Sequence, residues 1–350
     1  MRWPKMADTE KFMESFIRGL PKAELHIHLE GALEPEIMFK MANRNRVRIR
    51  YKTVEEVREA YRFKNLKDFL NVYYEGTGVL INEQDFYDLA WSYFQKASCQ
   101  NVLHAEVFFD PQAHTRRGVK FEDVVCGFHR ALVDAEKRLG VTSRLIMCFL
   151  RDLSPESAME TLEEAMPYKE WISAVGLNSA EAGNPPSKFN KVFERAVEEG
   201  FLTVAHAGEE GPAEYVWEAV NLLKVSRIDH GNRALEDESL VKELVRRKIP
   251  LTLCPISNLK LGVVKRLEDH PLKKMMDRGL MVTVNSDDPA YFGGYINENY
   301  LAVYKALNLS VNQIYKLAEN SFEASFMNAE QKRNTRKKLE GYMKSVKSSL

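Results

Sequence analysis

The chain has 350 residues, of which 45% are hydrophobic, so it can bury a large core. Its 50 basic and 50 acidic residues leave no formal net charge, which argues against a nucleic acid or a membrane surface as partner. No run reaches the ~18 apolar residues needed to span a bilayer, and residues 1–16 lack the apolar core of a signal peptide. The four cysteines form no CxxC pair, as expected of reduced thiols, and the sequence therefore predicts a cytoplasmic protein.

Short apolar stretches alternate with longer amphipathic ones along the chain. The short stretches are nearly continuous in apolar residues, which is typical of parallel strands covered on both faces. In the segments between them, apolar side chains such as Phe121, Val125 and Phe128 fall on one side of a helix. Eight strands alternating with helices predict an α/β fold, a (β/α)8 TIM barrel. The predicted strands are Ala23–His28, Val102–Phe109, Arg144–Leu150, Ala174–Asn178, Leu202–Ala207, Arg227–His230, Pro250–Cys254 and Met281–Asn285.

Additional helical segments flank the predicted barrel repeat. The first crossover, from Leu33 to Gln100, is much longer than the others, and we interpret it as a helical insertion that caps the barrel and includes a candidate lid. Extra C-terminal helices are expected at about Glu298–Leu307 and Val311–Met327, followed by a basic, solvated helix over Gln331–Lys347. Neither internal repeats nor Pro/Gly linkers interrupt residues 1–350, which we predict to form one domain.

Histidines and carboxylates cluster at the ends of four predicted strands. His26 and His28 are two residues apart in the first strand, so both imidazoles point the same way. An HxH pair alone is a weak signal, since most such pairs are incidental. Its position matters more, because the active sites of (β/α)8 barrels lie at the carboxyl ends of the strands.

The fifth and sixth predicted strands also end in histidines. His206 closes an apolar run, and Gly208 lets the backbone bend so that Glu209 can fold back toward the strand end. His230 ends the sixth strand. A buried, hydrogen-bonded histidine and a surface glutamate would explain each motif equally well when it is taken alone.

Two adjacent carboxylates, Asp287 and Asp288, follow the eighth predicted strand. They repel each other and favour a cation between them, whereas a helix N-cap would account for only one of them. Coincidence at four strand ends together is improbable. The set predicts a mononuclear metal hydrolase, with ligands, an open position for water and groups that transfer protons.

These motifs resemble those of the adenosine/adenine deaminase family of metal-dependent hydrolases over nearly the whole chain. The matching segments are Pro21–Gly31, Ala205–Glu209, Ile228–Gly231 and Asn285–Pro289. Three further segments resemble the adenine deaminase branch in particular, namely Phe108–Gln112, Cys148–Asp152 and Pro289–Tyr295.

The resemblance implies zinc-dependent hydrolysis of adenine to hypoxanthine and ammonia, as in purine salvage. It assigns one Zn²⁺ to His26, His28, His206 and Asp287. It makes Glu209 the acid that protonates N1 of the purine, with His230 and Asp288 orienting the attacking hydroxide and Asp288 able to contact N7. The implied partner is a small purine base. The sequence does not specify the oligomeric state, so a homo-oligomer is compatible with it.

The choice between base and nucleoside depends on the loop after the fourth predicted strand. Glu181 is our candidate acceptor for the N9–H of free adenine, in space that a ribose would need. Gly183 is a second candidate for substrate binding, because adenosine deaminases resemble one another in having a nearby glycine that gives backbone access to N3. The adenine branch more usually has Asp at Asn178 and His at Asn184. These departures keep an adenosine or N6-substituted adenine deaminase open as an alternative.

A third alternative is a catalytically silent, purine-binding barrel. The presence of Glu209, His230 and Asp288 together argues against it, since a binding protein has no need of all three. The zinc site of cytidine deaminases is also disfavoured, because no PCxxC segment follows either HxE motif.

Overall fold

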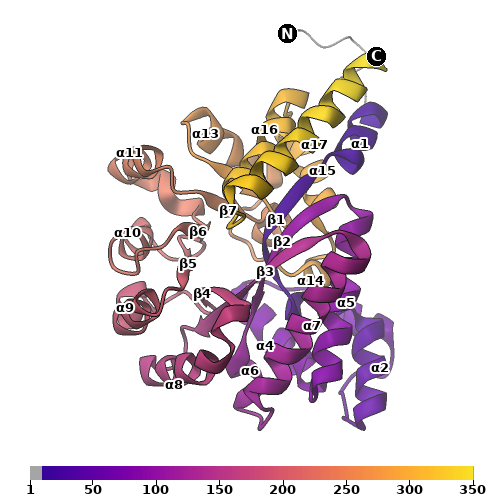
Figure 1. Ribbon diagram of the computed structural model, residues 1–350, viewed down its shortest axis with the longest axis vertical. Helices are drawn as coiled ribbons and strands as arrows, with labels where there is room; N and C mark the ends of the chain where they lie inside the picture. Colours follow the sequence, from indigo (N-terminus) through magenta and orange to yellow (C-terminus); the bar gives the residue numbers. More distant parts are fainter. Residues whose placement is uncertain (1–9, 350) are drawn as a thin grey trace.

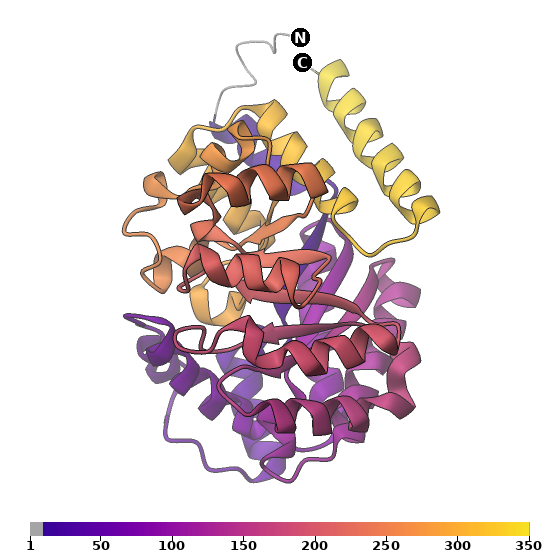
Figure 2. The ribbon, with the colours of Figure 1, turned by 90° about the vertical axis from the view of Figure 1, so that its left-hand side faces the viewer.

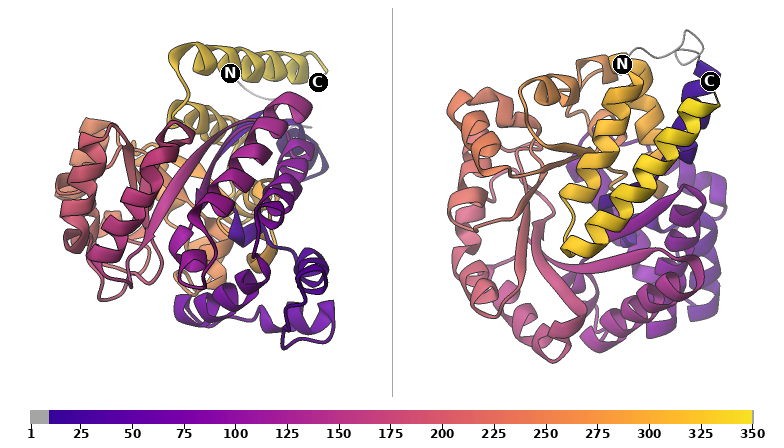
Figure 3. Two further views of the ribbon diagram at one scale, coloured as in Figure 1. Left: turned by 60° about the horizontal axis from the view of Figure 1, so that its bottom comes forward. Right: turned by 45° about the horizontal axis from the view of Figure 1, so that its top comes forward.

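The computed structural model describes residues 10–349 and contains one eight-stranded parallel sheet (Figure 1). The spatial order of the strands follows the chain order from β1 to β8, and helices surround the strands (Figure 3). The predicted (β/α)8 barrel is therefore confirmed. The strands are β1 Lys22–His28, β2 Val102–Phe109, β3 Thr142–Leu150, β4 Ile172–Asn178, β5 Leu202–Ala207, β6 Arg227–His230, β7 Leu251–Leu253 and β8 Val282–Val284.

The last two strands are shorter than predicted, and just beyond β8 a side chain makes the contact with β1. The backbone N–H of Asn285, just after β8, still donates to the carbonyl of Leu253 at 2.9 Å. Its side-chain Oδ1 accepts a hydrogen bond from the backbone N–H of Leu25 at 2.8 Å. Asn285 thus links β8 to β1, where regular strand pairing has already ended.

Helices on the outside of the barrel cover the apolar outer face of the strands. Their buried residues are mostly Ala, Val, Leu and Phe, as expected for amphipathic helices packed on a sheet. The helices of this outer ring are α7 Phe121–Leu139, α8 Pro155–Ala165, α9 Asn190–Glu198, α10 Ala213–Asn221, α11 Glu238–Arg247 and α13 Leu272–Asp277.

The long first crossover folds into four helices, as its helical pattern predicts. They lie in the lower part of Figure 1, away from the C-terminal helix at the top. A small apolar cluster, separate from the main core, joins α4 to the segment after β8 through Phe69, Tyr291 and Phe292. This contact holds α4 over the carboxyl ends of the strands. The helices of the insertion are α2 Pro35–Asn45, α3 Val54–Ala60, α4 Leu66–Gly76 and α5 Glu83–Cys99.

The C-terminal helices close the barrel opposite the insertion. Ser321, in α16, accepts a hydrogen bond from the N–H of Ala23 in β1, and Asn320 donates to the carbonyl of Val282 in β8. Helix α16 therefore covers the junction of β8 with β1, while α17 extends along the outside (Figure 2). Among residues 10–349, no helix combines the length and apolar character needed to cross a membrane. The helices are α15 Ile296–Leu307, α16 Val311–Glu323 and α17 Ala329–Ser348.

An ion pair lies in the interior of the barrel. Arg227 of β6 and Glu106 of β2 are both fully buried and form a short hydrogen-bonded contact. Although burial raises the pKa of Glu106, the charges of Arg227 and His104 lower it to about 2, so the carboxylate stays ionised. Arg227 also donates to the carbonyl of Leu25 at 3.0 Å, which ties the pair to the strand that carries His26.

Replacing Arg227 by Met should destabilise the barrel strongly. The variant leaves the Glu106 carboxylate buried without its partner, which typically costs about 3–5 kcal/mol of unfolding free energy. Urea denaturation followed by circular dichroism measures the change. The Glu106→Gln/Arg227→Met double variant is the control and should recover part of the loss. A single variant within about 1 kcal/mol of the wild type would contradict this prediction.

Candidate metal centre and active site

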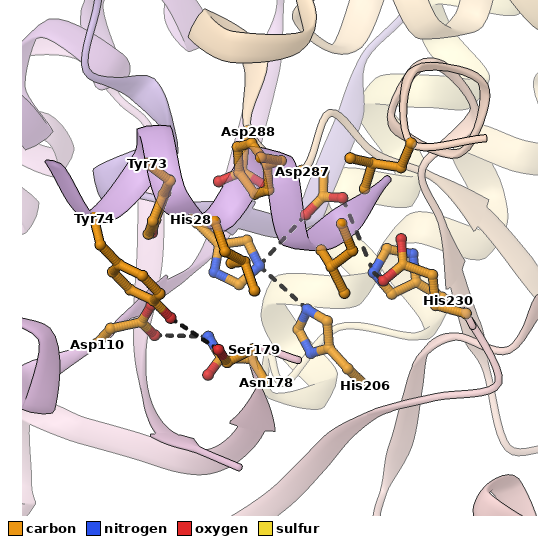
Figure 4. A pocket seen from close by; sticks show the side chains of 15 residues that line it. His28, Tyr73, Tyr74, Asp110, Asn178, Ser179, His206, His230, Asp287 and Asp288 are labelled. Atoms are coloured by element: carbon orange, nitrogen blue, oxygen red, sulfur yellow. Dashed lines mark hydrogen bonds and ion pairs between the residues drawn. The ribbon is translucent and has the colours of Figure 1, made fainter. Parts of the chain in front are cut away.

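Four side chains converge at the carboxyl ends of the strands (Figure 4). They are His26 and His28 of β1, His206 of β5, and Asp287 just after β8, and one potential ligand atom from each lies within 4.8 Å of all the others. Asp287 Oδ1 is 3.1 Å from Nε2 of His26 and 3.4 Å from Nε2 of His28. The Nε2 atoms of His28 and His206 are 3.2 Å apart. The four predicted ligands are thus brought together from three parts of the chain.

The backbone places Asp287 between the two histidines of β1. Its N–H donates to the carbonyl of His26, and its carbonyl accepts from the N–H of His28, at 3.1 and 3.0 Å. Asp287 has a φ of 65°, in the left-handed region that residues other than glycine rarely adopt. This conformation turns the carboxylate toward the imidazoles, and the two backbone hydrogen bonds hold it there.

The donor set fits a divalent metal ion. Nε2 of His26 is buried and makes no hydrogen bond, although Asp287 Oδ1 lies 3.1 Å away, and this is costly unless a ligand binds there. Its other ring nitrogen, Nδ1, is 2.9 Å from the hydroxyl of Thr252, which donates to Asp229. A hydroxyl and a carboxylate behind the ring fix its orientation, as is usual for metal-binding histidines. Three imidazole nitrogens and one carboxylate oxygen are suitable ligands for zinc.

The charges of the site favour a bound cation. Burial alone would raise the pKa of Asp287, but His26 and His28 lower it well below its usual value, so Asp287 is ionised. Burial would lower the pKa of His28, but Asp288 and Asp287 raise it to about 10. The same carboxylates that attract this proton attract a metal ion in its place. Burial and the charge of His26 lower the pKa of His206 well below its usual value, which leaves a neutral ring able to bind metal.

A second set of potential ligands shares His26 and Asp287 and adds His230 and Cys254. Burial and the charge of Asp287 raise the pKa of the Cys254 thiol well above its usual value. The thiolate, which is the form that binds metal, is therefore disfavoured. The first set of ligands is the better metal site.

Glu209, His230 and Asp288 surround the four potential ligands. Nε2 of His230 is 3.5 Å from Glu209 Oε2 and 3.9 Å from Asp287 Oδ2. The amide of Asn258 donates to Glu209 Oε1 at 3.4 Å. Asp288 packs against Gly31, and a side chain at Gly31 would overlap its carboxylate. The three residues predicted for proton transfer thus lie beside the predicted ligands.

Burial controls the protonation of these acidic groups. Burial raises the pKa of Glu209 well above its usual value, and the negative charges of Asp287 and Glu181 raise it further. Burial and the charge of Asp287 do the same to the pKa of Asp288. Burial and the charge of His26 lower the pKa of His230 well below its usual value. A protonated carboxyl group and a neutral imidazole at pH 7 form an acid and base pair.

A pocket opens beside these residues, and the space between its lining atoms is about 390 Å³ with the open solvent at its mouth included. Helix α4 supplies much of its apolar wall, so the candidate lid of the sequence analysis lies over the site. His28, His206 and Asp287 lie along one part of the pocket, and a polar group lies at the other end (Figure 4). The lining residues contributed by loops and helices include Leu66, Phe69, Leu70, Tyr73, Tyr74, Asp110, Ser179, Glu209, Leu261 and Asp288.

The position of Glu181 differs from the sequence expectation. Glu181 does not line the pocket; it is buried beneath the loop after β5. Its two carboxylate oxygens accept hydrogen bonds from four consecutive backbone N–H groups, those of residues 208–211, at 2.7–3.0 Å. The carboxylate is fully occupied and cannot also accept the N–H of a purine. Glu181 holds the loop that carries Glu209.

Gly183 is likewise outside the pocket, on an exposed turn with a φ of 78°. Gly183 is therefore not in a position to offer its backbone to a purine in this pocket. Two polar residues to which the sequence gave no substrate-binding role do line the pocket, namely Asp110 after β2 and Asn178 at the end of β4. Their places at strand ends were the available signal.

Replacing Glu181 by Ala should loosen the loop after β5 and lower stability. Four backbone N–H groups lose a charged acceptor, and we expect a loss of about 3 kcal/mol or more in unfolding free energy. Residual activity should keep the wild-type ratio of rates on adenine and adenosine, since Glu181 does not reach the pocket. Urea denaturation and rates on both compounds test this, with Glu214→Ala, an exposed glutamate of α10, as control. A change in the rate ratio would restore Glu181 as a substrate contact.

Several known proteins are similar to this chain in sequence and in fold. The model of the adenosine deaminase family matches residues 21–342. The chain is 61% identical over 318 residues to an adenine deaminase of Acinetobacter baylyi, covering 91% of this chain and 96% of that protein. The crystal structure of an adenine deaminase from Arthrobacter aurescens, 47% identical, has a TM-score of 0.92 and covers 93% of this chain and 100% of that one.

An amidohydrolase from Burkholderia ambifaria, solved with bound Zn, is 25% identical and has a TM-score of 0.87, covering 96% of this chain and 94% of that one. The family match extends over most of the chain and includes every strand of the barrel. The chain therefore belongs to the adenosine deaminase family.

Proposed function

We propose that this chain hydrolyses adenine to hypoxanthine and ammonia with the aid of one zinc ion. The observation that carries the proposal is the carboxyl group of Glu209, buried beside three histidines and an aspartate that suit a metal. The high identity to the adenine deaminases of Acinetobacter baylyi and Arthrobacter aurescens favours the free base as substrate. The reaction breaks the C6–N6 bond of adenine and forms a C6–O bond from water.

Zinc is our choice of metal because of the donor set and the related zinc-containing amidohydrolase. His26, His28, His206 and Asp287 would hold the ion, with no sulfur ligand. A zinc ion bound there would lower the pKa of a bound water toward ~7 and so supply hydroxide at neutral pH. Thr252 and Asp229 would keep the ring of His26 turned toward the ion.

Glu209 acts as the general acid. Its raised pKa keeps the carboxyl protonated at neutral pH, so it can donate to N1 of the purine as the C6–N1 bond loses double-bond character. The hydrogen bond from Asn258 occupies Oε1, which leaves Oε2 to carry the proton. Neutral His230 would orient the attacking oxygen and accept its proton, and Asp288, which lines the pocket, would help to orient that oxygen and contact N7.

Release of the C6 amine from a panel of purines, followed as formation of the 6-oxo product, tests this proposal. The purified protein, loaded with zinc, should release ammonia from adenine at least about tenfold faster than it releases ammonia from adenosine or methylamine from N6-methyladenine. Removal of zinc with a chelator should abolish the activity, and added zinc should restore it. A faster reaction with adenosine or N6-methyladenine would contradict adenine as the substrate and identify that compound instead. Release that is unaffected by the chelator would contradict the metal assignment.

Changing Glu209 to Gln should remove the general acid without changing the shape of the side chain. We expect kcat to fall by on the order of 10²–10⁴-fold, because general acid catalysis contributes about this much. Since the protonated carboxyl is the active form, wild-type kcat should fall as the pH rises through the raised pKa of Glu209. The residual rate of the Gln variant should lack this alkaline limb. The measurement is kcat between pH 5 and 10 for both proteins, with their zinc content as control. The same pH profile for both would contradict the assignment.

A further inference from the structure

A pair of buried polar side chains lies at the end of the pocket away from Asp287 and His230 (Figure 4). Asp110 directly follows β2, and Asn178 is the last residue of β4; both line the pocket and are almost completely buried. The amide Nδ2 of Asn178 donates to Asp110 Oδ1 at 2.6 Å. None of the groups that we assign to catalysis contacts this pair through a described hydrogen bond.

The pair leaves a buried acceptor without a partner. Asn178 Oδ1 is shielded from solvent and makes no hydrogen bond. A buried carbonyl oxygen normally has a partner, because leaving one unpaired is unfavourable. Since Asn178 lines the pocket, a ligand that donates an N–H would satisfy it.

The surroundings of the pair are buried and negatively charged. Burial and the charge of Glu30 raise the pKa of Asp110 to about 7, and the hydrogen bond from Asn178 opposes that rise. The backbone N–H of Asp110 donates to Glu30 Oε1 at 3.0 Å, which fixes the backbone, while Asn178 holds the side chain. Next to the pair, the hydroxyl groups of Tyr74 and Ser179 bond to each other at 2.9 Å and close this end of the pocket.

The proposed reaction orients the base. If C6 lies at the metal centre and N1 at Glu209, the N3 and N9 edge of the purine points to the opposite end of the pocket. The N–H at N9 exists only in the free base, because a ribose replaces its hydrogen in a nucleoside. The polar group that N9 meets therefore decides between base and nucleoside.

We propose that Asp110 and Asn178 together accept the N9–H of free adenine and thereby select the base over its N9-substituted forms. This inference rests on the proposed function and moves to this pair the role that the sequence analysis gave to Glu181. A substrate substituted at N9 leaves a buried acceptor unpaired, and sites built around such a hydrogen bond often discriminate by about 10⁴-fold or more. Asp110 is held by Asn178 and by Glu30, so the acceptors are already oriented before the base binds.

The test compares adenine with 9-methyladenine, which lacks the N9–H. Asn178→Ala removes the acceptor and leaves room for the methyl group. We expect its KM for adenine to rise about tenfold or more with a smaller change in kcat, because the contact is made equally in substrate and transition state. The ratio of kcat/KM for the two compounds should fall at least about tenfold. A variant that retains the wild-type ratio would overturn the inference.

Two further variants separate recognition from folding. Asn178→Asp keeps an acceptor, and at pH 6 it can share one proton with Asp110, so its ratio should stay within about threefold of the wild type. Asn184→Ala, in the same loop but outside the pocket lining, is the matched control and should change neither KM nor the ratio. A loss of discrimination in the Asn184 control as well would assign the effect to the loop and overturn the inference.

A binding measurement keeps this inference distinct from the proposed function. Calorimetry with hypoxanthine and 9-methylhypoxanthine reports recognition of the N9–H even if adenine is not turned over. Wild-type protein should bind hypoxanthine at least about tenfold more tightly, and Asn178→Ala should reduce that preference. No ammonia from adenine would contradict the proposed function alone, whereas equal binding of the two ligands by the wild type would contradict the role of the pair.

Discussion

The junction between β8 and β1 is the constraint on which the site depends. Regular pairing ends at Val284, and the barrel is completed by the side chain of Asn285 and the backbone of Asp287. The backbone of Asp287 forms hydrogen bonds with His26 and His28, on either side of Ile27. The same contacts therefore close the barrel and place the carboxylate between the two imidazoles. A metal site formed in this way requires the complete barrel, so folding and ligand geometry are coupled.

This closure depends on unfavourable backbone conformations that the surroundings stabilise. Asp287 and His230 both have φ near 65°, and each such residue costs about 1–3 kcal/mol. Glu24, buried in β1, accepts hydrogen bonds from the backbone and the hydroxyl of Ser286, next to Asp287. Strain at the site is thus offset by hydrogen bonds in the barrel below it, which leaves little freedom for the side chains that meet the metal and the substrate.

The sequence predicted the strands well because each is an apolar run covered on both faces, and β2, β5 and β6 have the predicted bounds. The convergence of the strand-end histidines was also predictable, since it depends on local periodicity and on the architecture, whereas the choice of His26, His28, His206 and Asp287 as metal ligands came from the family resemblance. Glu181 was misplaced for a physical reason. Its position after β4 is visible in the sequence, but whether it faces the pocket or the neighbouring loop depends on the path of residues 208–211. The role of Asn178 and Asp110 likewise depends on a contact between the ends of β4 and β2, which the sequence does not show.

The buried glutamates of the rim connect structure to chemistry. Glu30 fixes the backbone of Asp110 at the substrate end, and Glu181 fixes the backbone of Glu209 at the metal end. Burying a carboxylate beside Glu209 is costly, yet its negative charge contributes to the raised pKa that keeps Glu209 protonated. A neutral glutamine at position 181 could accept hydrogen bonds from only some of the N–H groups of residues 208–211, and the negative charge of Glu181 would be lost. The residue that positions the loop therefore also helps to set the acidity of the group that the loop carries.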